Sequence, residues 1–239
     1  MIFGDLKTVL RVSIPVIVVL AAAIAIFGGT MVTVSDFPAD GLALPSLGLM
    51  SLFFVAYILA ILWMAVAWHR YCLLAEYPGA FLPNFHGDRI AAYFGRMLML
   101  VLIAMVIGGL GSFVIGLVIG TGSGSFGVVG GALGLTGMLA LIWAFQRLSI
   151  ILPAAAIGEP LTLGEAWAAT APLSMPIIGV LVLLLLFSLA MGLAVGALTL
   201  IHPAIGMLGN LIMSWLQTVL GLSILTTLYG VAVQGRDID

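Results

Sequence analysis

The chain has 239 residues, of which 64% are apolar and 7% are charged, with 30 glycines, one cysteine and a net charge of −2. An average soluble domain carries roughly 25% charged residues, so this composition excludes an ordinary water-soluble protein. Seven cations are too few for the phosphate contacts of a nucleic-acid-binding surface, and one cysteine cannot form an internal disulfide. The composition predicts an integral membrane protein without a nucleic-acid partner.

Six uncharged apolar stretches are long enough to cross a hydrocarbon layer of about 30 Å as helices. In chain order they cover residues 12–33, 47–68, 97–119, 127–146, 176–199 and 205–233. The fourth run continues past Arg147 to Pro153, so this helix is either long or bent. It counts as one crossing, because an arginine in mid-bilayer costs a few kcal/mol. We expect a single all-α integral membrane domain, residues 1–239, with six spans and short cytoplasmic interfacial helices.

The cations orient this topology. With six spans, one side of the membrane receives Lys7, Arg11, Arg70, Arg89, Arg96, Arg147 and Arg236. The other side receives Asp36, Asp40 and His202, together with a Gly/Ser loop over residues 120–125. Because positive charge is enriched on the cytoplasmic side of membrane proteins, we expect both termini in the cytoplasm.

Two of the connections on the charged side resemble one another. Residues 68–70 (Trp-His-Arg) lead through two prolines to residues 88–93, and residues 145–147 (Phe-Gln-Arg) lead through two prolines to residues 163–167. This similarity indicates a helix hairpin followed by a short interfacial helix, used twice. The alternative is that helix ends attract aromatic and Arg side chains as interface anchors, here Trp68, Arg70, Arg147 and Trp167.

Small residues recur at four-residue spacing in three spans. The repeats are Gly116 and Gly120, then Gly127 and Gly131 or Gly130 and Gly134, and finally Ser188, Gly192 and Gly196. Helices in membranes associate by close packing of small residues, so these faces predict helix packing, with a ligand groove as the alternative.

The last span carries the only concentrated polarity inside the predicted membrane region. Asn210, Ser214, Gln217 and Gly221 fall within an arc of roughly 60° when successive helical residues are turned by 100°. An amide exposed to acyl chains loses hydrogen bonds worth a few kcal/mol, so this stripe must face protein or water. It is either interhelical packing or a polar pathway or pocket. No carboxylate, Lys or Arg lies deep in any span, which argues against a proton- or sodium-coupled carrier.

No catalytic pattern emerges from the remaining polar residues. His69, Cys72 and His86 are the candidates for nucleophilic or metal chemistry, beside the acids Glu76, Asp88, Glu159 and Glu165. Their spacing matches no zinc site, and the Gly/Ser loop lacks the lysine of a phosphate-binding loop. His202, alone before Pro203, is more typical of a loop than of a ligand. We therefore expect no enzyme, no cofactor and no metal site, and an enzyme built on residues 69–88 is the weakest hypothesis.

One local motif is structurally specific. Residues 162–165 (Thr-Leu-Gly-Glu) form a Thr-x-x-Glu capping box, in which Thr162 and Glu165 each bond the backbone of the other. This motif predicts a short helix that carries Trp167 and ends before Pro172.

The segments 147–153 and 161–170 resemble a pattern in bacterial inner-membrane proteins. The pattern is an Arg at a helix end, a Pro soon after, and a short amphipathic helix with Ala-Trp or Ala-Leu, and it is similar to the YciC-like families and to the membrane domain of some glycerophosphodiester phosphodiesterases. Residues 68–96 are also similar to uncharacterised alphaproteobacterial members. The resemblance implies a multi-helix protein of the bacterial inner membrane and carries no activity.

These observations favour a non-catalytic inner-membrane protein that binds other membrane proteins or lipids, for example as an accessory, assembly or scaffold subunit. The alternative is a small transporter or channel for an uncharged or lipidic solute, with the polar stripe of the last span as its pathway.

Overall fold

A computed structural model describes residues 6–31, 44–119 and 125–237, and over these residues the chain is all-helical. Six helices in this part are long and apolar enough to cross a membrane, which confirms the predicted class and the six spans. The chain is a multi-pass membrane protein. Asp36, Asp40 and Gly120 lie outside the described residues.

The six long helices are α1 (Leu6–Met31), α2 (Leu44–Leu74), α3 (Gly87–Ile119), α4 (Ser125–Leu148), α7 (Ser174–Ile201) and α8 (Pro203–Ala232). Three short segments, α5 (Ile151–Ile157), α6 (Leu163–Ala169) and the 3₁₀ turn η1 (Ala171–Leu173), connect α4 to α7. Helix α3 begins ten residues before the predicted boundary. Its 33 residues rise about 50 Å, more than the roughly 30 Å of hydrocarbon, so its first turns carry Arg89 and Arg96 outside the apolar layer.

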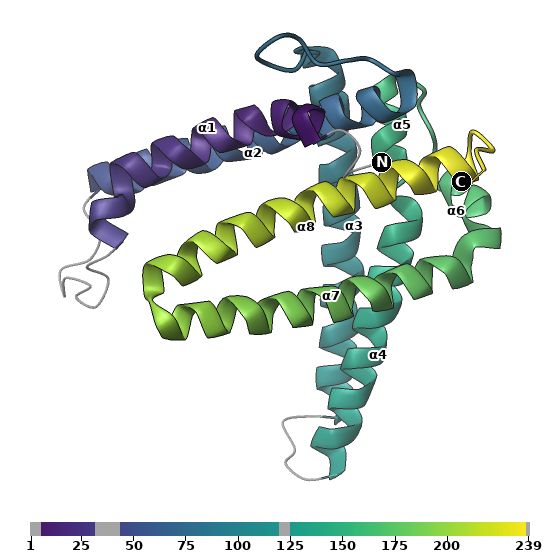
Figure 1. Ribbon diagram of the computed structural model, residues 1–239. Helices are drawn as coiled ribbons and strands as arrows, with labels where there is room; N and C mark the ends of the chain where they lie inside the picture. Colours follow the sequence, from purple (N-terminus) through teal and green to yellow (C-terminus); the bar gives the residue numbers. More distant parts are fainter. Residues whose placement is uncertain (1–5, 32–43, 120–124, 238–239) are drawn as a thin grey trace. The chain divides into compact units, whose positions relative to one another are not determined.

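The contacts divide the chain into two compact units, Met1–Tyr93 and Phe94–Asp239. In the first unit, α1 and α2 pack side by side (Figure 1). Val12 on α1 and Val66 on α2 are fully buried. Ser13 is buried as well, and its hydroxyl donates to the carbonyl of Val9 at 2.9 Å within the same helix, so this hydroxyl is bonded within the apolar core.

In the second unit, α7 and α8 form an antiparallel hairpin (Figure 1). His202 alone links them, and its Nδ1 accepts from the backbone N–H of Ala204 at 3.2 Å, so it caps α8. The helices approach closely at Gly206, where a Cβ would clash with Thr199 Oγ1 and lie 2.7 Å from Thr199 Cα. Only glycine fits there without moving a backbone.

The fourth apolar run is a broken helix. Helix α4 ends at Leu148, and the hydroxyl of Ser149 donates back to the carbonyl of Phe145 at 2.6 Å. Helix α5 follows, almost wholly buried, and ends at Gly158 with a left-handed φ of 87°. That conformation lets the Gly158 N–H donate to Ala154 at 3.1 Å and terminate the helix.

The sequence similarity predicts a separate short helix in each of two connections, and for the connection between α2 and α3 this prediction is wrong. Residues 88–93 form the first turns of α3, whereas α6 is a separate helix in the second connection. The sequence from Tyr93 to Arg96 holds no proline, so the helix continues into the membrane. In the second connection Pro172 lies in η1, and the helix is interrupted there.

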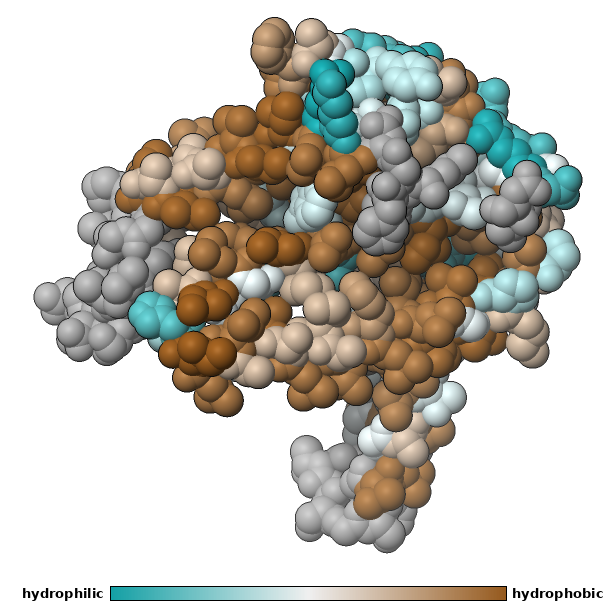
Figure 2. All heavy atoms as spheres, viewed as in Figure 1, coloured by the Kyte–Doolittle hydropathy of each residue, from teal (hydrophilic) through white to brown (hydrophobic). Residues whose placement is uncertain are grey.

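The long helices expose apolar side chains along their lengths. Figure 2 shows hydrophobic residues covering the visible faces of α1 and α7. Leu183, Leu193 and Leu200 on α7 are more than half exposed. These faces suit acyl chains, which need no hydrogen bonds.

Candidate functional site

The predicted stripe of α8 is joined by a polar residue of α7. The Nε2 of Gln217 donates to the hydroxyl of Ser188 at 3.3 Å, and the hydroxyl of Ser214 donates to Asn210 Oδ1 at 3.3 Å. We call these four residues the polar strip. All four are exposed. Ser188 lies near the middle of α7 and Gln217 near the middle of α8, so their bond lies at mid-span.

Glycines on the same hairpin leave its surface open. Gly192 and Gly196 follow Ser188 on one face of α7, and Gly221 follows Gln217 on α8. A Cβ built at any of these three glycines would meet nothing within 4 Å. The polar strip and these glycines therefore form one uncovered surface, and the hairpin itself uses Gly206 for its internal packing.

The glycines predicted to pack α3 and α4 are also uncovered. At Gly116, Gly131 and Gly134 a Cβ would meet nothing within 4 Å, and Gly130 is half-buried. Gly120 and the side-chain surroundings of Gly127 lie outside the described part of the structure. Helix packing at these positions stays a prediction.

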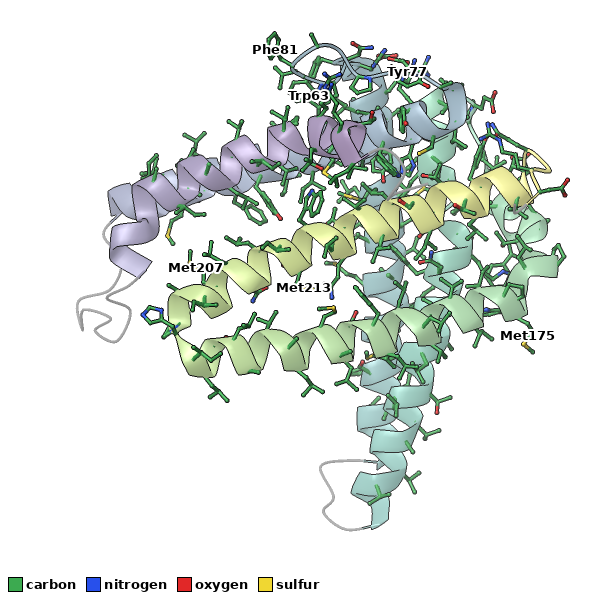
Figure 3. The ribbon with its side chains drawn as sticks, viewed as in Figure 1. Trp63, Tyr77, Phe81, Met175, Met207 and Met213 are labelled. Atoms are coloured by element: carbon green, nitrogen blue, oxygen red, sulfur yellow. The ribbon has the colours of Figure 1, made fainter. Side chains whose placement is uncertain are left out.

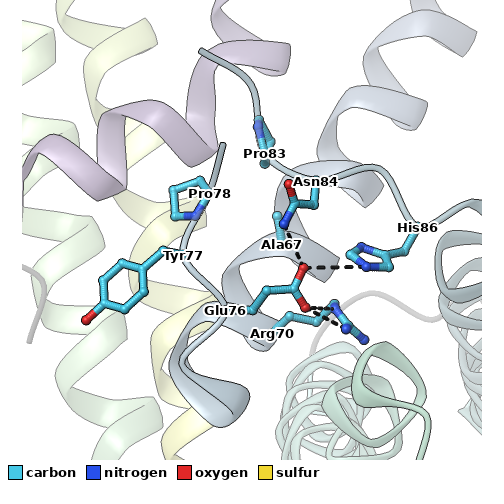
Figure 4. Close-up of a pocket in the computed structure, with 8 residues that line it drawn as sticks. All are labelled: Ala67, Arg70, Glu76, Tyr77, Pro78, Pro83, Asn84 and His86. Atoms are coloured by element: carbon cyan, nitrogen blue, oxygen red, sulfur yellow. Dashed lines mark hydrogen bonds and ion pairs between the residues drawn. The ribbon is translucent and has the colours of Figure 1, made fainter. Parts of the chain in front are cut away.

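A charged cluster fastens the connection between α2 and α3. Glu76 Oε2 pairs with Arg70, at 2.5 Å from Nη2 and 2.8 Å from Nε. Glu76 Oε1 accepts from Asn84 Nδ2 at 3.0 Å and lies 3.4 Å from His86 Nε2 (Figure 4). We call these four residues the Glu76 cluster. Both carboxylate oxygens are occupied by groups of the same chain.

The surroundings of Glu76 stabilise its charged form. Burial alone raises the pKa of Glu76, but the hydrogen bonds from Asn84 and Arg70 and the charges of Arg70 and His86 outweigh it. The net result is a pKa below the ordinary value for this carboxyl group.

A small pocket with an empty volume of about 200 Å³ adjoins the cluster. Ala67, Tyr77, Pro78 and Pro83 complete its lining (Figure 4). The Nδ1 of His86 is a buried atom without a hydrogen-bond partner among the described residues. No group of three potential metal ligands lies together in the part of the chain that the structure describes.

A second polar arrangement, the Arg147 clamp, joins the end of α4 to α6. The side chain of Arg147 is buried, with Nε donating to Thr170 Oγ1 at 3.1 Å and Nη2 donating to the carbonyl of Trp167 at 2.5 Å. Its guanidinium carbon lies 3.7 Å from the ring centre of Trp167 and 5.0 Å from that of Trp143. Arg147 thus holds the short helix α6 against α4.

The predicted interface anchors lie in different surroundings. Trp68 is 3% and Arg147 4% exposed, so the protein itself buries both side chains, and an anchoring role for them stays a prediction. Arg70 belongs to the Glu76 cluster. Trp167 is 41% exposed, and its anchoring role stays a prediction.

Most of the candidate catalytic residues are engaged in structural contacts. His69 is fully buried, stacks on Tyr93, and places Nε2 3.4 Å from the Tyr93 hydroxyl. Glu159 accepts from the hydroxyl of Tyr229 at 3.0 Å, and Asp88 pairs with Arg89 at 3.1 Å. Cys72 is half-buried. The structure brings together Glu76 and His86, whose ion pair sequence reasoning did not identify.

The capping box is confirmed. Thr162 Oγ1 accepts from the N–H of Glu165 at 3.3 Å, and Glu165 Oε2 accepts from the N–H of Thr162 at 2.8 Å. The Thr162 N–H and hydroxyl both donate to the Glu165 carboxylate, and these bonds lower the pKa of Glu165. Helix α6 ends at Ala169, before Pro172, as the motif predicts.

The chain matches no known family model, and no curated protein and no solved structure is significantly similar to it. The resemblance to the YciC-like group therefore stays a prediction.

Proposed function

We propose that this chain is a non-catalytic protein of the bacterial inner membrane, with both termini in the cytoplasm, that works as an accessory or assembly subunit. It binds another membrane protein through the open face of the α7–α8 hairpin. The observation that carries the proposal is the exposed polar strip at mid-span.

The depth of the strip makes its exposure costly. Ser188 and Gln217 each lie about 20 Å from the ends of their helices, which is near the centre of a bilayer. A glutamine side chain offers two N–H donors and one carbonyl, and the bond to Ser188 uses one donor. Each group left without a partner in hydrocarbon costs on the order of a few kcal/mol. A second polar surface must therefore cover the strip.

The glycines beside the strip suit a helix as the occupant. Gly192 and Gly196 present backbone without side chains, so another helix can approach closely at the level where the strip offers hydrogen bonds. Acyl chains fill the same space without supplying donors or acceptors. This combination favours a protein segment over lipid as the partner.

The test is copurification from native membranes in a mild detergent. The wild-type chain should bring down a membrane protein in fixed stoichiometry, and Gly192→Phe should reduce its recovery at least tenfold by filling the open face. Leu183→Phe is the matched control, because Leu183 is exposed on the opposite face of α7 and should retain the partner. A wild-type chain that purifies alone, or equal recovery with both variants, would contradict the proposal.

A second candidate function is a pathway for an uncharged or lipidic solute. It is favoured by the continuity of the strip across two helices, since Gln217 bonds to Ser188 rather than within α8. The double variant Asn210→Leu/Gln217→Leu distinguishes the two candidate functions. Loss of solute movement with an intact partner complex indicates a pathway, and loss of the complex indicates a binding surface.

A further inference from the structure

The connection between α2 and α3 folds back along α2. The indole N–H of Trp63 donates to the carbonyl of Asn84 at 3.2 Å, and the ring of Trp63 meets Phe85 edge to face, with centres 5.2 Å apart. Trp63 lies three turns before the end of α2 at Leu74, about 16 Å along the helix axis. Residues 75–86, which we call the return loop, therefore descend beside the helix instead of projecting from its end.

That descent brings the return loop to the level of lipid. Helix α2 has 31 residues and is about 46 Å long, so it exceeds the hydrocarbon core of about 30 Å by roughly 8 Å at each end. A segment that reaches Trp63 from Leu74 passes the headgroups and arrives at the acyl boundary. The carbonyl of Asn84, near the deepest point, is satisfied by Trp63, as backbone at that depth requires.

The polar side chains of the return loop interact with one another, and its large apolar side chains are exposed. Glu76, Asn84 and His86 interact with one another and with Arg70. The outward side chains are apolar or aromatic: Tyr77 is 68%, Phe81 84%, Leu82 48% and Phe85 67% exposed. Figure 3 shows Phe81 at the outer edge of the loop. Water would leave these side chains unfavourably hydrated, whereas a headgroup–acyl boundary accommodates aromatic rings.

The loop is held in this form by its own packing. A Cβ at Gly79 would lie 2.8 Å from the carbonyl oxygen of Leu82, so the tip is a tight turn that requires glycine. Tyr77 packs on Tyr71 of α2 with ring centres 5.5 Å apart, and Glu76 is fixed by Arg70. The exposed rings are thus presented in one arrangement before any partner arrives.

We propose that the return loop is a membrane-dipping element, which binds the headgroup–acyl boundary of the leaflet that holds the C-terminal end of α2. Phe81 and Leu82 enter the acyl region, and the Glu76–Arg70 ion pair remains at headgroup level. This contact is independent of the partner surface on α7 and α8.

Spin labels on the full-length protein test the depth of the loop. Phe81→Cys and Leu82→Cys, in a Cys72→Ala background that removes the single native cysteine, are labelled and reconstituted into phosphatidylethanolamine–phosphatidylglycerol vesicles. Collision rates are measured with oxygen, which concentrates among acyl chains, and with a nickel chelate, which stays in water. Asp237→Cys is the control, an exposed charged position beyond the last span. Ala80→Cys supplies a further exposed site in the same loop.

The ratio of oxygen to nickel collisions should be several-fold higher at positions 81 and 82 than at position 237. A ratio equal to that of the control would place the loop in water and overturn the proposal. Low collision rates with both reagents would show that a protein covers the loop, which overturns it as well.

Discussion

The Glu76 cluster and the polar strip contain similar side chains in opposite situations. In the Glu76 cluster a carboxylate meets Arg70, Asn84 and His86, and both of its oxygens are occupied. In the polar strip, Gln217 and Ser188 share one bond at mid-span and remain exposed. The Arg147 clamp belongs with the first case, since it is buried and bonded at the end of a helix.

The comparison indicates that polar side chains have two different roles in this chain. The polar side chains of Glu76, Arg70 and Arg147, at the helix ends, stabilise the fold, because they bond to partners within the same unit. Polar side chains at mid-span are left with unused hydrogen-bonding capacity, where the surroundings supply none. Substitutions at the helix ends should therefore lower the free energy of unfolding, and substitutions in the polar strip should change association.

The largest loss is expected for Arg147→Met. It removes hydrogen bonds to Thr170 and to the Trp167 carbonyl together with the stacking on two tryptophan rings, about 3 kcal/mol of stability in all. Thermal unfolding in detergent measures the loss. Arg89→Met is the control, because Arg89 is partly exposed and pairs with an exposed Asp88, and it should change stability by less than about 0.5 kcal/mol. Equal losses would erase the distinction between buried and exposed cations.

Gly206→Ala should cost about 2 kcal/mol, because its methyl group meets the backbone and hydroxyl of Thr199 and forces α7 and α8 apart. Gly192→Ala is the matched substitution on the open face, where a methyl group meets nothing and alanine is the better helix former. The second variant should be as stable as the wild type or slightly more so. Chemical unfolding of the two variants in parallel measures their stabilities. Equal stability would contradict the close approach of Gly206 to Thr199.

Glu76→Gln should cost about 1 kcal/mol at neutral pH, since it removes a charge that faces Arg70 and His86 in a half-buried site. The pKa of Glu76 is lower in the folded chain than its ordinary value of 4.5, so the ionised carboxylate stabilises the fold above that pH. The contribution is lost as pH falls through the lower, folded pKa. The melting temperatures of wild type and variant should therefore differ at pH 7 and converge only as the pH falls below the folded pKa of Glu76. A difference in melting temperature that persists in acid would show that the substitution acts through packing and not through the charge of Glu76.

Gln217→Leu should have the smallest effect on stability, about 0.5 kcal/mol, because hydrogen bonds between membrane helices contribute little and this one is exposed. Its effect should appear in the recovery of the copurified partner. A large loss of stability in the isolated protein would show that the polar strip, like the Glu76 cluster, stabilises the fold.

Features governed by local rules could be predicted from the sequence. The six spans depend on hydropathy over about 20 residues, and the capping box depends on two residues three positions apart. His202 was expected in a loop and forms the turn between two spans. Helix α3 begins at Gly87, ahead of the span predicted from residue 97, because that span covers only the uncharged run and Arg89 and Arg96 precede it. A helix can carry charges once it has left the hydrocarbon.

Features that depend on distant contacts could not be predicted. Arg147 meets Trp167 and Thr170 only because α6 returns to α4, and no periodicity encodes that return. The return loop is similar, since its position depends on contacts such as the bond between Trp63 and Asn84, which are 21 positions apart. The sequence identified several polar residues of these sites, but not which of them are satisfied within the chain.

The single-residue turn at His202 constrains how the protein enters its membrane. Helix α7 ends at Ile201 and α8 begins at Pro203, so the end of one helix and the start of the other lie at the same depth. No Asp, Glu, Lys or Arg lies between Glu165 and Arg236, so the turn carries little that resists passage through hydrocarbon. We therefore expect the two spans to insert into the bilayer together, as one hairpin.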